Sequence, residues 1–172
     1  PGPLGGHDWQ AMSFDEKKGV VYIPAQDAPW LYSVDAEYKA TGLYKPNPGT
    51  LNLGQDLANS SFLAAKYADE QPASKGYLKA FDPLTGEDLW SVDHVHYWNS
   101  GVLATEGGLV FQGDGLGYLS AFDADTGDKL WTFNTYISML APPVTYEIDG
   151  EQYVAILAGT GTAENFLGYT ND

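Results

Sequence analysis

A 15-residue pattern occurs twice in this chain of 172 residues, and no other feature constrains its fold as strongly. The first copy begins at Gly76 and the second at Gly117, 41 positions later, and ten of the 15 positions are identical. Each copy has a short alternating strand, an Asp-x-x-Thr-Gly turn and a second strand that opens with Leu-Trp. Because Asp can bond backbone amides within a turn and Gly tolerates a positive φ, each copy predicts a β-hairpin.

A second type of hairpin is predicted from three pairs of short apolar runs, each pair separated by a Gly-containing turn. These pairs are 12–14 with 20–24, 102–105 with 109–113, and 144–147 with 153–158. Two hairpins in about 41 residues make a four-stranded antiparallel unit, which is the composition of a propeller blade. The predicted fold class is therefore all-β, a β-propeller segment of about two and a half four-stranded antiparallel blades. Helical periodicity is nearly absent, and 56–67 is the only helix candidate.

These patterns predict a single partial β-propeller domain over residues 1–172. Blade 1 is expected at 4–93, with an insertion at 26–75, blade 2 at 94–134, and a half blade at 135–162. The insertion is too long for a hairpin turn and is expected to act as a lid. Closed propellers have roughly four to eight blades, and an open stack exposes strand edges. We therefore expect this chain to be a segment of a larger propeller.

Three loops precede the predicted inner strands of the blades, and we name them loop A (4–10), loop B (94–101) and loop C (134–143). In a propeller, each inner strand follows the outermost strand of the preceding blade, so these loops should meet on one face around the central axis. They carry two of the five tryptophans and all three histidines. Aromatic and amide groups gathered in this way suit a flat conjugated ligand.

The composition excludes several classes of partner. Eight basic residues stand against 23 acidic ones, a net charge of −15, and all eight are lysines. Without arginine there is no forked recognition of phosphate or guanine, and the acidic field repels polyanions, so no nucleic-acid partner is expected. The absence of cysteine excludes thiol chemistry within the chain. No apolar run approaches the roughly 18 residues of a membrane helix, so no membrane span is expected.

The repeated Ala-Phe-Asp-x-x-Thr-Gly-x-x-Leu-Trp is similar to the tryptophan-docking motif of the pyrroloquinoline quinone (PQQ)-dependent alcohol dehydrogenases. The chain resembles the C-terminal part of these quinoproteins, which are eight-bladed propellers of the bacterial periplasm. Trp90 and Trp131 would be the docking indoles, each packed against the next blade. More specific matches lie at 4–9, at 98–105 with 108–113, and at 141–146 with 149–150 and 152–154.

The resemblance implies oxidation of alcohols to aldehydes or ketones by metal-assisted hydride transfer to the quinone. It implies PQQ and Ca²⁺ (or a lanthanide) as cofactors, the metal acting as a Lewis acid. In the family, the catalytic aspartate and the metal ligands come from earlier blades, so this segment is expected to hold neither and to be inactive alone. The implied partners are a small-molecule alcohol, the N-terminal part of the propeller, and a cytochrome c or another electron acceptor. The implied location is the periplasm.

The resemblance also assigns site residues. Cofactor contacts fall on Asp8, Trp9 and Met139, and residues beside the substrate chamber fall on Trp98 and Asn99. The chain departs from the family in two places. Asp8 replaces an amide that would donate to the quinone, whereas a carboxylate can donate only when protonated. Residues 136–138 replace a small Gly-Ser-Gly, which is expected to narrow the pocket.

Other interpretations of the sequence remain open at this stage. His94 and His96 form a potential metal pair that lacks a third ligand. Residues 123–128 superficially resemble a calcium loop, but Leu84 stands at the second acidic position in the other copy, which favours a hairpin turn. At the level of function, the alternatives are a non-catalytic scaffold resembling the outer-membrane assembly lipoproteins and a quinoprotein sugar dehydrogenase. Such a scaffold does not need the Gly-Gly-x-x-Trp loop or the long insertion.

Overall fold

The computed structural model describes residues 2, 4–46, 48, 52–56, 59–70 and 72–159. The chain divides into two compact units. The strand unit comprises Leu4–Ala28 and the chain from Ser74 onward, and the insertion unit is centred on Pro29–Ala73. The all-β class is confirmed, because antiparallel strands dominate the described residues. The domain and blade boundaries drawn from the sequence stay predictions.

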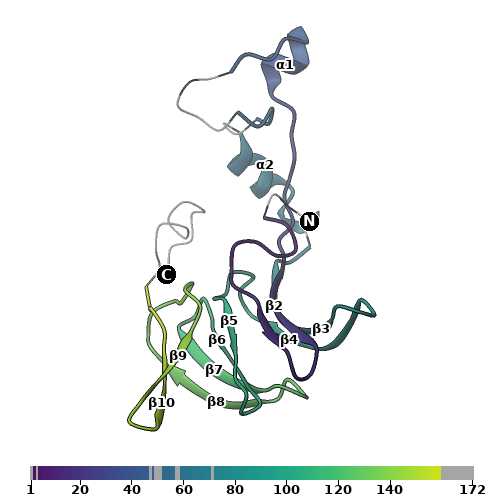
Figure 1. Cartoon of the computed structure of the whole chain (residues 1–172). Helices are drawn as coiled ribbons and strands as arrows, with labels where there is room; N and C mark the ends of the chain where they lie inside the picture. Colours follow the sequence, from purple (N-terminus) through teal and green to yellow (C-terminus); the bar gives the residue numbers. More distant parts are fainter. Residues whose placement is uncertain are drawn as a thin grey trace. The chain divides into compact units, whose positions relative to one another are not determined.

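The strand unit contains three antiparallel sheets that lie side by side (Figure 1). Two of them have four strands each, in the orders β1-β2-β3-β4 and β5-β6-β7-β8, and the third is the pair β9-β10. The strands are β1 (Ser13–Asp15), β2 (Val20–Asp27), β3 (Lys75–Asp82), β4 (Glu87–His94), β5 (Val102–Ala104), β6 (Leu109–Gly113), β7 (Tyr118–Asp123), β8 (Lys129–Asn134), β9 (Val144–Ile148) and β10 (Glu151–Ala155). Every predicted hairpin is therefore present.

The two repeat copies fold in the same way down to their irregularities. Asp82 Oδ1 accepts hydrogen bonds from the amides of the second and third residues after it, and Asp123 Oδ1 does the same. Gly86 and Gly127 close the turns with φ of 80° and 77°. Each hairpin also has a register shift at its Ala-Phe pair. The acidic cluster at 123–128 is thus a hairpin turn, as Leu84 in the first copy had indicated.

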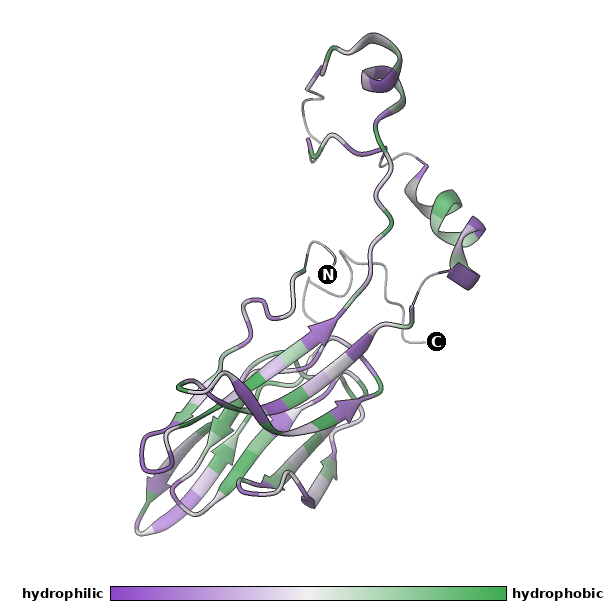
Figure 2. Cartoon of the chain, turned by 90° about the vertical axis from the view of Figure 1, so that its right-hand side faces the viewer, coloured by the Kyte–Doolittle hydropathy of each residue, from purple (hydrophilic) through white to green (hydrophobic). Residues whose placement is uncertain are grey.

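The main core lies where the two four-stranded sheets pack together. Its buried residues are Val20, Tyr22, Leu78, Ala80, Val102, Val110, Phe122 and Ala124. The strand β2 shows why: its alternate residues are buried from Val20 onward, so one face of the pleat is apolar. Green hydrophobic segments follow these strands in Figure 2.

Trp90 joins the two four-stranded sheets. Its Nε1 donates to Ala124 O at 3.1 Å, and the Tyr22 hydroxyl donates to the same oxygen at 3.0 Å. The Trp90 ring also packs against the core cluster. The docking predicted for this tryptophan is therefore confirmed.

The same docking stays a prediction for Trp131. Its side chain is 48% exposed and stacks on Phe133, with ring centroids 6.2 Å apart and an angle of 8° between the planes. Within residues 72–159, only the hairpin β9-β10 comes after β8. No counterpart of the Ala124 turn is described beyond it to receive the indole.

The insertion unit contains short helices: α1 (Ala36–Thr41), α2 (Ser60–Lys66) and the 3₁₀ turn η1 (Ala68–Glu70). The helix candidate 56–67 is confirmed by α2, but the expectation that it was the only one is wrong. Asp35 caps α1 by accepting from Tyr38 N at 2.8 Å, and Gly42 ends it with φ of 68°. The role of the insertion as a lid stays a prediction. In the described part of the chain, no helix is long and apolar enough to span a membrane.

Candidate functional site

Loops A, B and C converge at one end of the strand unit, as predicted. A buried apolar cluster contains Tyr97 and Trp98 of loop B, Leu140 of loop C and Ala28 after β2, with Leu4 of loop A packed against it. Residues 11–93 separate loop A from loop B, and residues 102–133 separate loop B from loop C, so the radial arrangement of the sheets brings the loops together.

Gly101 marks the point where the three loops cross. A Cβ on this residue would lie 2.8 Å from Ala11 N, just after loop A, and 2.8 Å from Pro142 Cβ in loop C. Real Cβ atoms almost never approach other atoms this closely. Any other residue at this position would push the loops apart.

Trp9 and Trp98 form an aromatic pair within this convergence. Their ring centroids are 6.1 Å apart and the rings are tilted by 60°. Trp98 is 7% exposed and makes an edge contact with Tyr97, whereas Trp9 is 53% exposed. Asp8 beside it is also exposed. A buried aromatic base thus supports an exposed indole, which suits stacking with a flat ligand.

Two buried polar atoms lie next to this pair without a partner. Asn99 Nδ2 donates to His96 O at 2.8 Å, but Asn99 Oδ1 and Trp98 Nε1 make no hydrogen bond within the described residues. Both side chains are more than nine-tenths buried. A buried polar group left unpaired costs about 1–3 kcal/mol, so such atoms mark places where a ligand or a water is accommodated.

Met139, which the resemblance assigned to the cofactor, is completely buried. Its side chain is 0% exposed. It packs on Gly113, where a Cβ would come within 2.8 Å of Met139 Cβ and 3.1 Å of its sulfur. The Met139 side chain offers no free surface in this structure, and its contact with a cofactor stays a prediction. Tyr136, one of the departures from the family, is 90% exposed and does not fill space among the loops.

His94 belongs to a hydrogen-bond network that the sequence did not reveal. Its Nε2 lies 2.8 Å from Gln112 Oε1, and Gln112 Nε2 donates to Ser100 O at 3.1 Å. The network links β4 to β6 and to loop B. Burial lowers the pKa of His94, because desolvation penalises its charged form. Across the described ranges, no three His, Cys, Asp or Glu side chains are grouped so that they could hold a metal ion.

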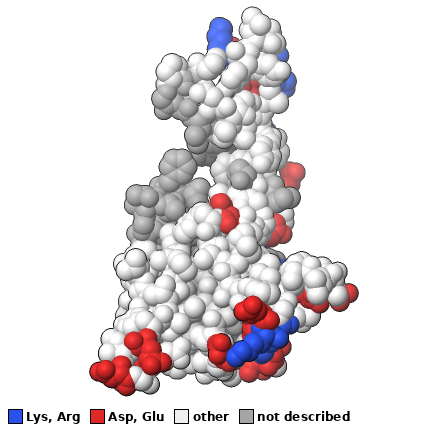
Figure 3. Space-filling model, in the orientation of Figure 1, with Lys and Arg blue, Asp and Glu red and all other residues white. Residues whose placement is uncertain are grey.

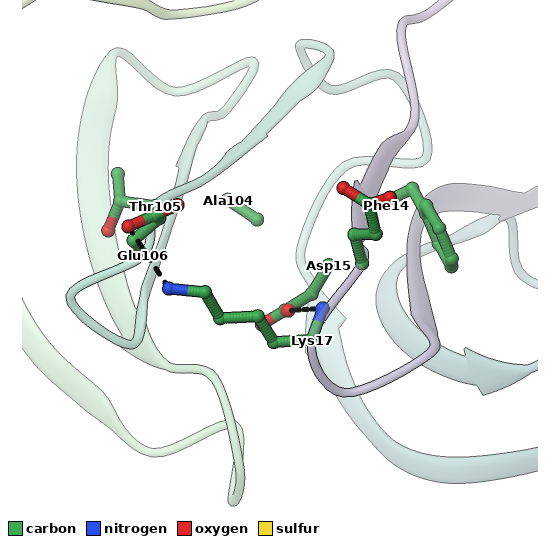
Figure 4. A pocket seen from close by; sticks show the side chains of 7 residues that line it. Phe14, Asp15, Lys17, Ala104, Thr105 and Glu106 are labelled. Carbon is green, nitrogen blue, oxygen red and sulfur yellow. Dashed lines mark hydrogen bonds and ion pairs between the residues drawn. The ribbon is translucent and has the colours of Figure 1, made fainter.

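A pocket of about 220 Å³ lies at the opposite ends of β1 and β5, between the β1-β2 and β5-β6 turns (Figure 4). Lys17 crosses it and pairs with Glu106 at 3.1 Å, and both side chains are largely exposed. Many acidic side chains gather at this end of the strand unit (Figure 3). Exposed charges of this kind are well screened, and the pocket is remote from the loops, so it is not the candidate site.

Comparison with known proteins gives the family. The sequence model of the PQQ family "glucose/ethanol/alcohol dehydrogenase, beta-propeller domain" matches residues 1–154. The dehydrogenase subunit of a quinone alcohol dehydrogenase from Gluconacetobacter polyoxogenes is 42% identical over 163 residues, which are 94% of this chain and 21% of that protein. A quinohemoprotein alcohol dehydrogenase from Comamonas testosteroni is 42% identical over 166 residues, which are 94% of this chain and 22% of that protein.

Solved structures agree with the sequences. A quinohemoprotein alcohol dehydrogenase from Pseudomonas putida HK5 superposes with a TM-score of 0.76 at 38% identity, covering 93% of this chain and 23% of that one. The Comamonas testosteroni enzyme gives 0.73 at 38% identity, covering 92% of this chain and 23% of that one. The chain therefore spans about a fifth of the length of these curated relatives. On this evidence, the chain belongs to the β-propeller family of the PQQ-dependent glucose, ethanol and alcohol dehydrogenases.

Proposed function

We propose that this chain forms part of the quinone-binding mouth of a PQQ-dependent dehydrogenase that oxidises alcohols to aldehydes or ketones. The observation that carries the proposal is the exposed Trp9 indole held against the buried Trp98 where three distant loops meet. The names of the relatives support an alcohol rather than a sugar as the substrate, since they are alcohol dehydrogenases of the quinone and quinohemoprotein types.

The residues present fit one side of PQQ. Trp9 offers an exposed ring for stacking on a planar tricyclic quinone, and Trp98 Nε1 and Asn99 Oδ1 are a buried donor and acceptor in need of partners. Loops A, B and C contain no lysine or arginine. The cations that neutralise the quinone carboxylates must therefore come from residues outside these loops. When bound, PQQ supplies the carbon that accepts hydride from the alcohol.

The roles of this chain's own residues follow from their burial. Trp9 would stack on the quinone and fix its plane, while Asp8 would lie at the ring edge, where only a protonated carboxyl can donate. Trp98 and Asn99 would border the alcohol chamber, and the apolar cluster beneath them would exclude water from it. Met139 is buried against Gly113 and would hold loop C in place.

The other components lie outside the described residues under this proposal. The Ca²⁺ or lanthanide ligands and the catalytic base would come from the rest of the propeller. A cytochrome c is the proposed electron acceptor, because one relative is named a 1-butanol dehydrogenase (cytochrome c). The proposed location is the periplasm.

The test uses the full-length protein that contains this chain, loaded with PQQ and Ca²⁺. Alcohol-dependent dye reduction is expected, with little response to a panel of sugars. Trp9→Ala should weaken quinone binding about tenfold, because an aromatic contact contributes about 0.5–1.5 kcal/mol beyond the area it buries. Phe14→Ala is the matched control, since Phe14 is an exposed aromatic of β1 that lies away from the loops.

Three outcomes would contradict the proposal in different ways. Bound quinone without reduction by any alcohol would remove the dehydrogenase activity, and a response to sugars alone would favour the sugar enzymes. A protein that binds no quinone at all would favour the scaffold interpretation.

A further inference from the structure

Gln26, near the end of β2, makes two hydrogen bonds to loop A. Its backbone N–H donates to Gly6 O at 2.8 Å, and its side-chain Nε2 donates to Leu4 O at 2.9 Å. Two residues earlier, Pro24 O lies 2.8 Å from His7 Nδ1. The strand β1 pairs only with residues 20–22 of β2, so loop A covers the rest of this strand edge. These three contacts hold the loop immediately before Asp8 and Trp9.

The same point of the sheet also receives loop B. Gln26 is paired with Gly76 of β3. A Cβ on Gly76 would lie 2.1 Å from His96 O and 2.4 Å from Asn99 Nδ2, so loop B rests directly on this glycine. The Gln26–Gly76 pair is therefore where the loops that carry Trp9 and Trp98 are both attached to the sheet.

Stability of the fold alone does not explain why a glutamine occupies position 26. The residue is 6% exposed, and its Oε1 accepts no hydrogen bond from any described residue. A buried acceptor without a partner is costly, so an apolar side chain of similar length would serve the fold at least as well. What an amide adds here is the Nε2 donor to Leu4 O.

We propose that Gln26 is a positioning residue for loop A, which sets Asp8 and Trp9 in register with Trp98 for contact with the flat ligand. This inference rests on the function proposed above, and it adds a residue that neither the sequence pattern nor the resemblance indicated. Gln26 touches only the loop and acts on the ligand through it.

The first test is Gln26→Met in the full-length protein, which removes the donor and the unpaired acceptor at similar volume. The thermal midpoint should stay close to that of the wild type, because these two losses offset each other. Hydrogen exchange of the backbone amide at position 26, which donates to Gly6 O of loop A, should become about fivefold faster, as expected when one hydrogen bond that holds the loop is lost. The exciton signal of the Trp9–Trp98 pair in circular dichroism should weaken, and quinone affinity should fall about fivefold.

The matched control is Ser13→Ala. It also removes one hydrogen bond between a side chain and the backbone, in which Ala104 N donates to Ser13 Oγ at 2.9 Å, between β1 and β5 and away from loop A. Exchange of the amide at position 26 and quinone affinity should stay at wild-type values in this variant. Trp9→Phe should abolish the exciton signal in circular dichroism, which shows that this signal comes from the Trp9–Trp98 pair.

A second variant, Gln26→Glu, keeps the shape and makes the donor depend on pH. At about pH 7 the ionised carboxylate cannot donate to Leu4 O, whereas at about pH 5 a buried carboxyl is substantially protonated and can. The ratio of the exchange rate of the amide at position 26 to the wild-type rate at the same pH should therefore return toward one as the pH falls.

The outcomes separate the two proposals. Unchanged exchange and an unchanged tryptophan signal in Gln26→Met, in a protein that binds the quinone, would overturn the positioning role alone. Failure of the wild-type protein to bind the quinone would overturn the proposed function, even if loop A loosened in the variant.

Discussion

The indole of Trp90 lies directly against Gly127 of the neighbouring sheet. A Cβ on Gly127 would come within 2.8 Å of Trp90 Cε3 and 2.9 Å of its Cδ2. Gly127 also has φ of 77°, a conformation that residues with a Cβ rarely adopt. The glycine of the repeated turn therefore does two things in the second copy: it closes the hairpin and it receives the tryptophan of the preceding blade.

This double role predicts that Gly127→Ala destabilises the protein by about 2–4 kcal/mol, from backbone strain and a steric clash together. Gly86→Ala is the matched control: Gly86 closes the same turn in the first copy with φ of 80°, but nothing lies within 4 Å of its Cβ position. Gly86→Ala should lower the stability only by the backbone strain, about 1–2 kcal/mol. Midpoints of thermal unfolding measure both, and equal costs would show that the tryptophan contact contributes nothing.

The stability costs of Trp90→Ala and Trp131→Ala should also differ, although the two tryptophans occupy equivalent positions in the repeat. Trp90→Ala removes a ring packed between sheets and should cost about 3–5 kcal/mol. In this chain, Trp131→Ala should cost much less, because the ring is half exposed. In the full-length protein, an equal cost for the two variants would show that a further segment covers Trp131, and acrylamide quenching of its fluorescence would then be weak.

The hairpins could be predicted because their signals are local. Alternating strands, an Asp that bonds the next amides and a Gly at positive φ all act within a few residues, and the sheet order follows from them. The helix α1 escaped because its six residues are too few to show a helical period, although its capping residues Asp35 and Gly42 are visible in the sequence. The docking of Trp131 stays a prediction, because it depends on residues beyond those that the structure describes.

The candidate site was predictable only in part. Topology and the resemblance brought Trp9 and Trp98 together correctly. The depth of Met139 depends on the space above Gly113, which no local pattern reports. Gln26 was missed because the sequence pattern placed it at the start of the insertion, whereas β2 continues to Asp27 and brings its side chain against loop A.

The pH dependence of stability should reveal His94. Burial lowers its pKa in the folded protein below the usual value near 6.5, so the unfolded chain binds the proton more readily. This contribution to stability is complete above pH 6.5, falls as the pH drops below it, and levels off below the folded pKa. His94→Gln does not titrate and keeps a polar partner for Gln112, so its thermal midpoint should fall less between about pH 7 and about pH 5. An identical decline in both proteins would place the acid sensitivity elsewhere.

Asp8 offers the most direct test of the quinone contact. A carboxylate at the ring edge cannot donate a hydrogen bond and adds a negative charge beside an anionic ligand, so Asp8→Asn should tighten quinone binding about three- to tenfold. Glu16→Gln removes the same charge from the opposite end of β1 and controls for the overall field of the chain. Titration of the apoprotein with PQQ, followed by tryptophan fluorescence, measures both variants. Equal affinities for the wild type, Asp8→Asn and Glu16→Gln would mean that Asp8 does not face the quinone, and the contact assigned to loop A would then fall to Trp9 alone.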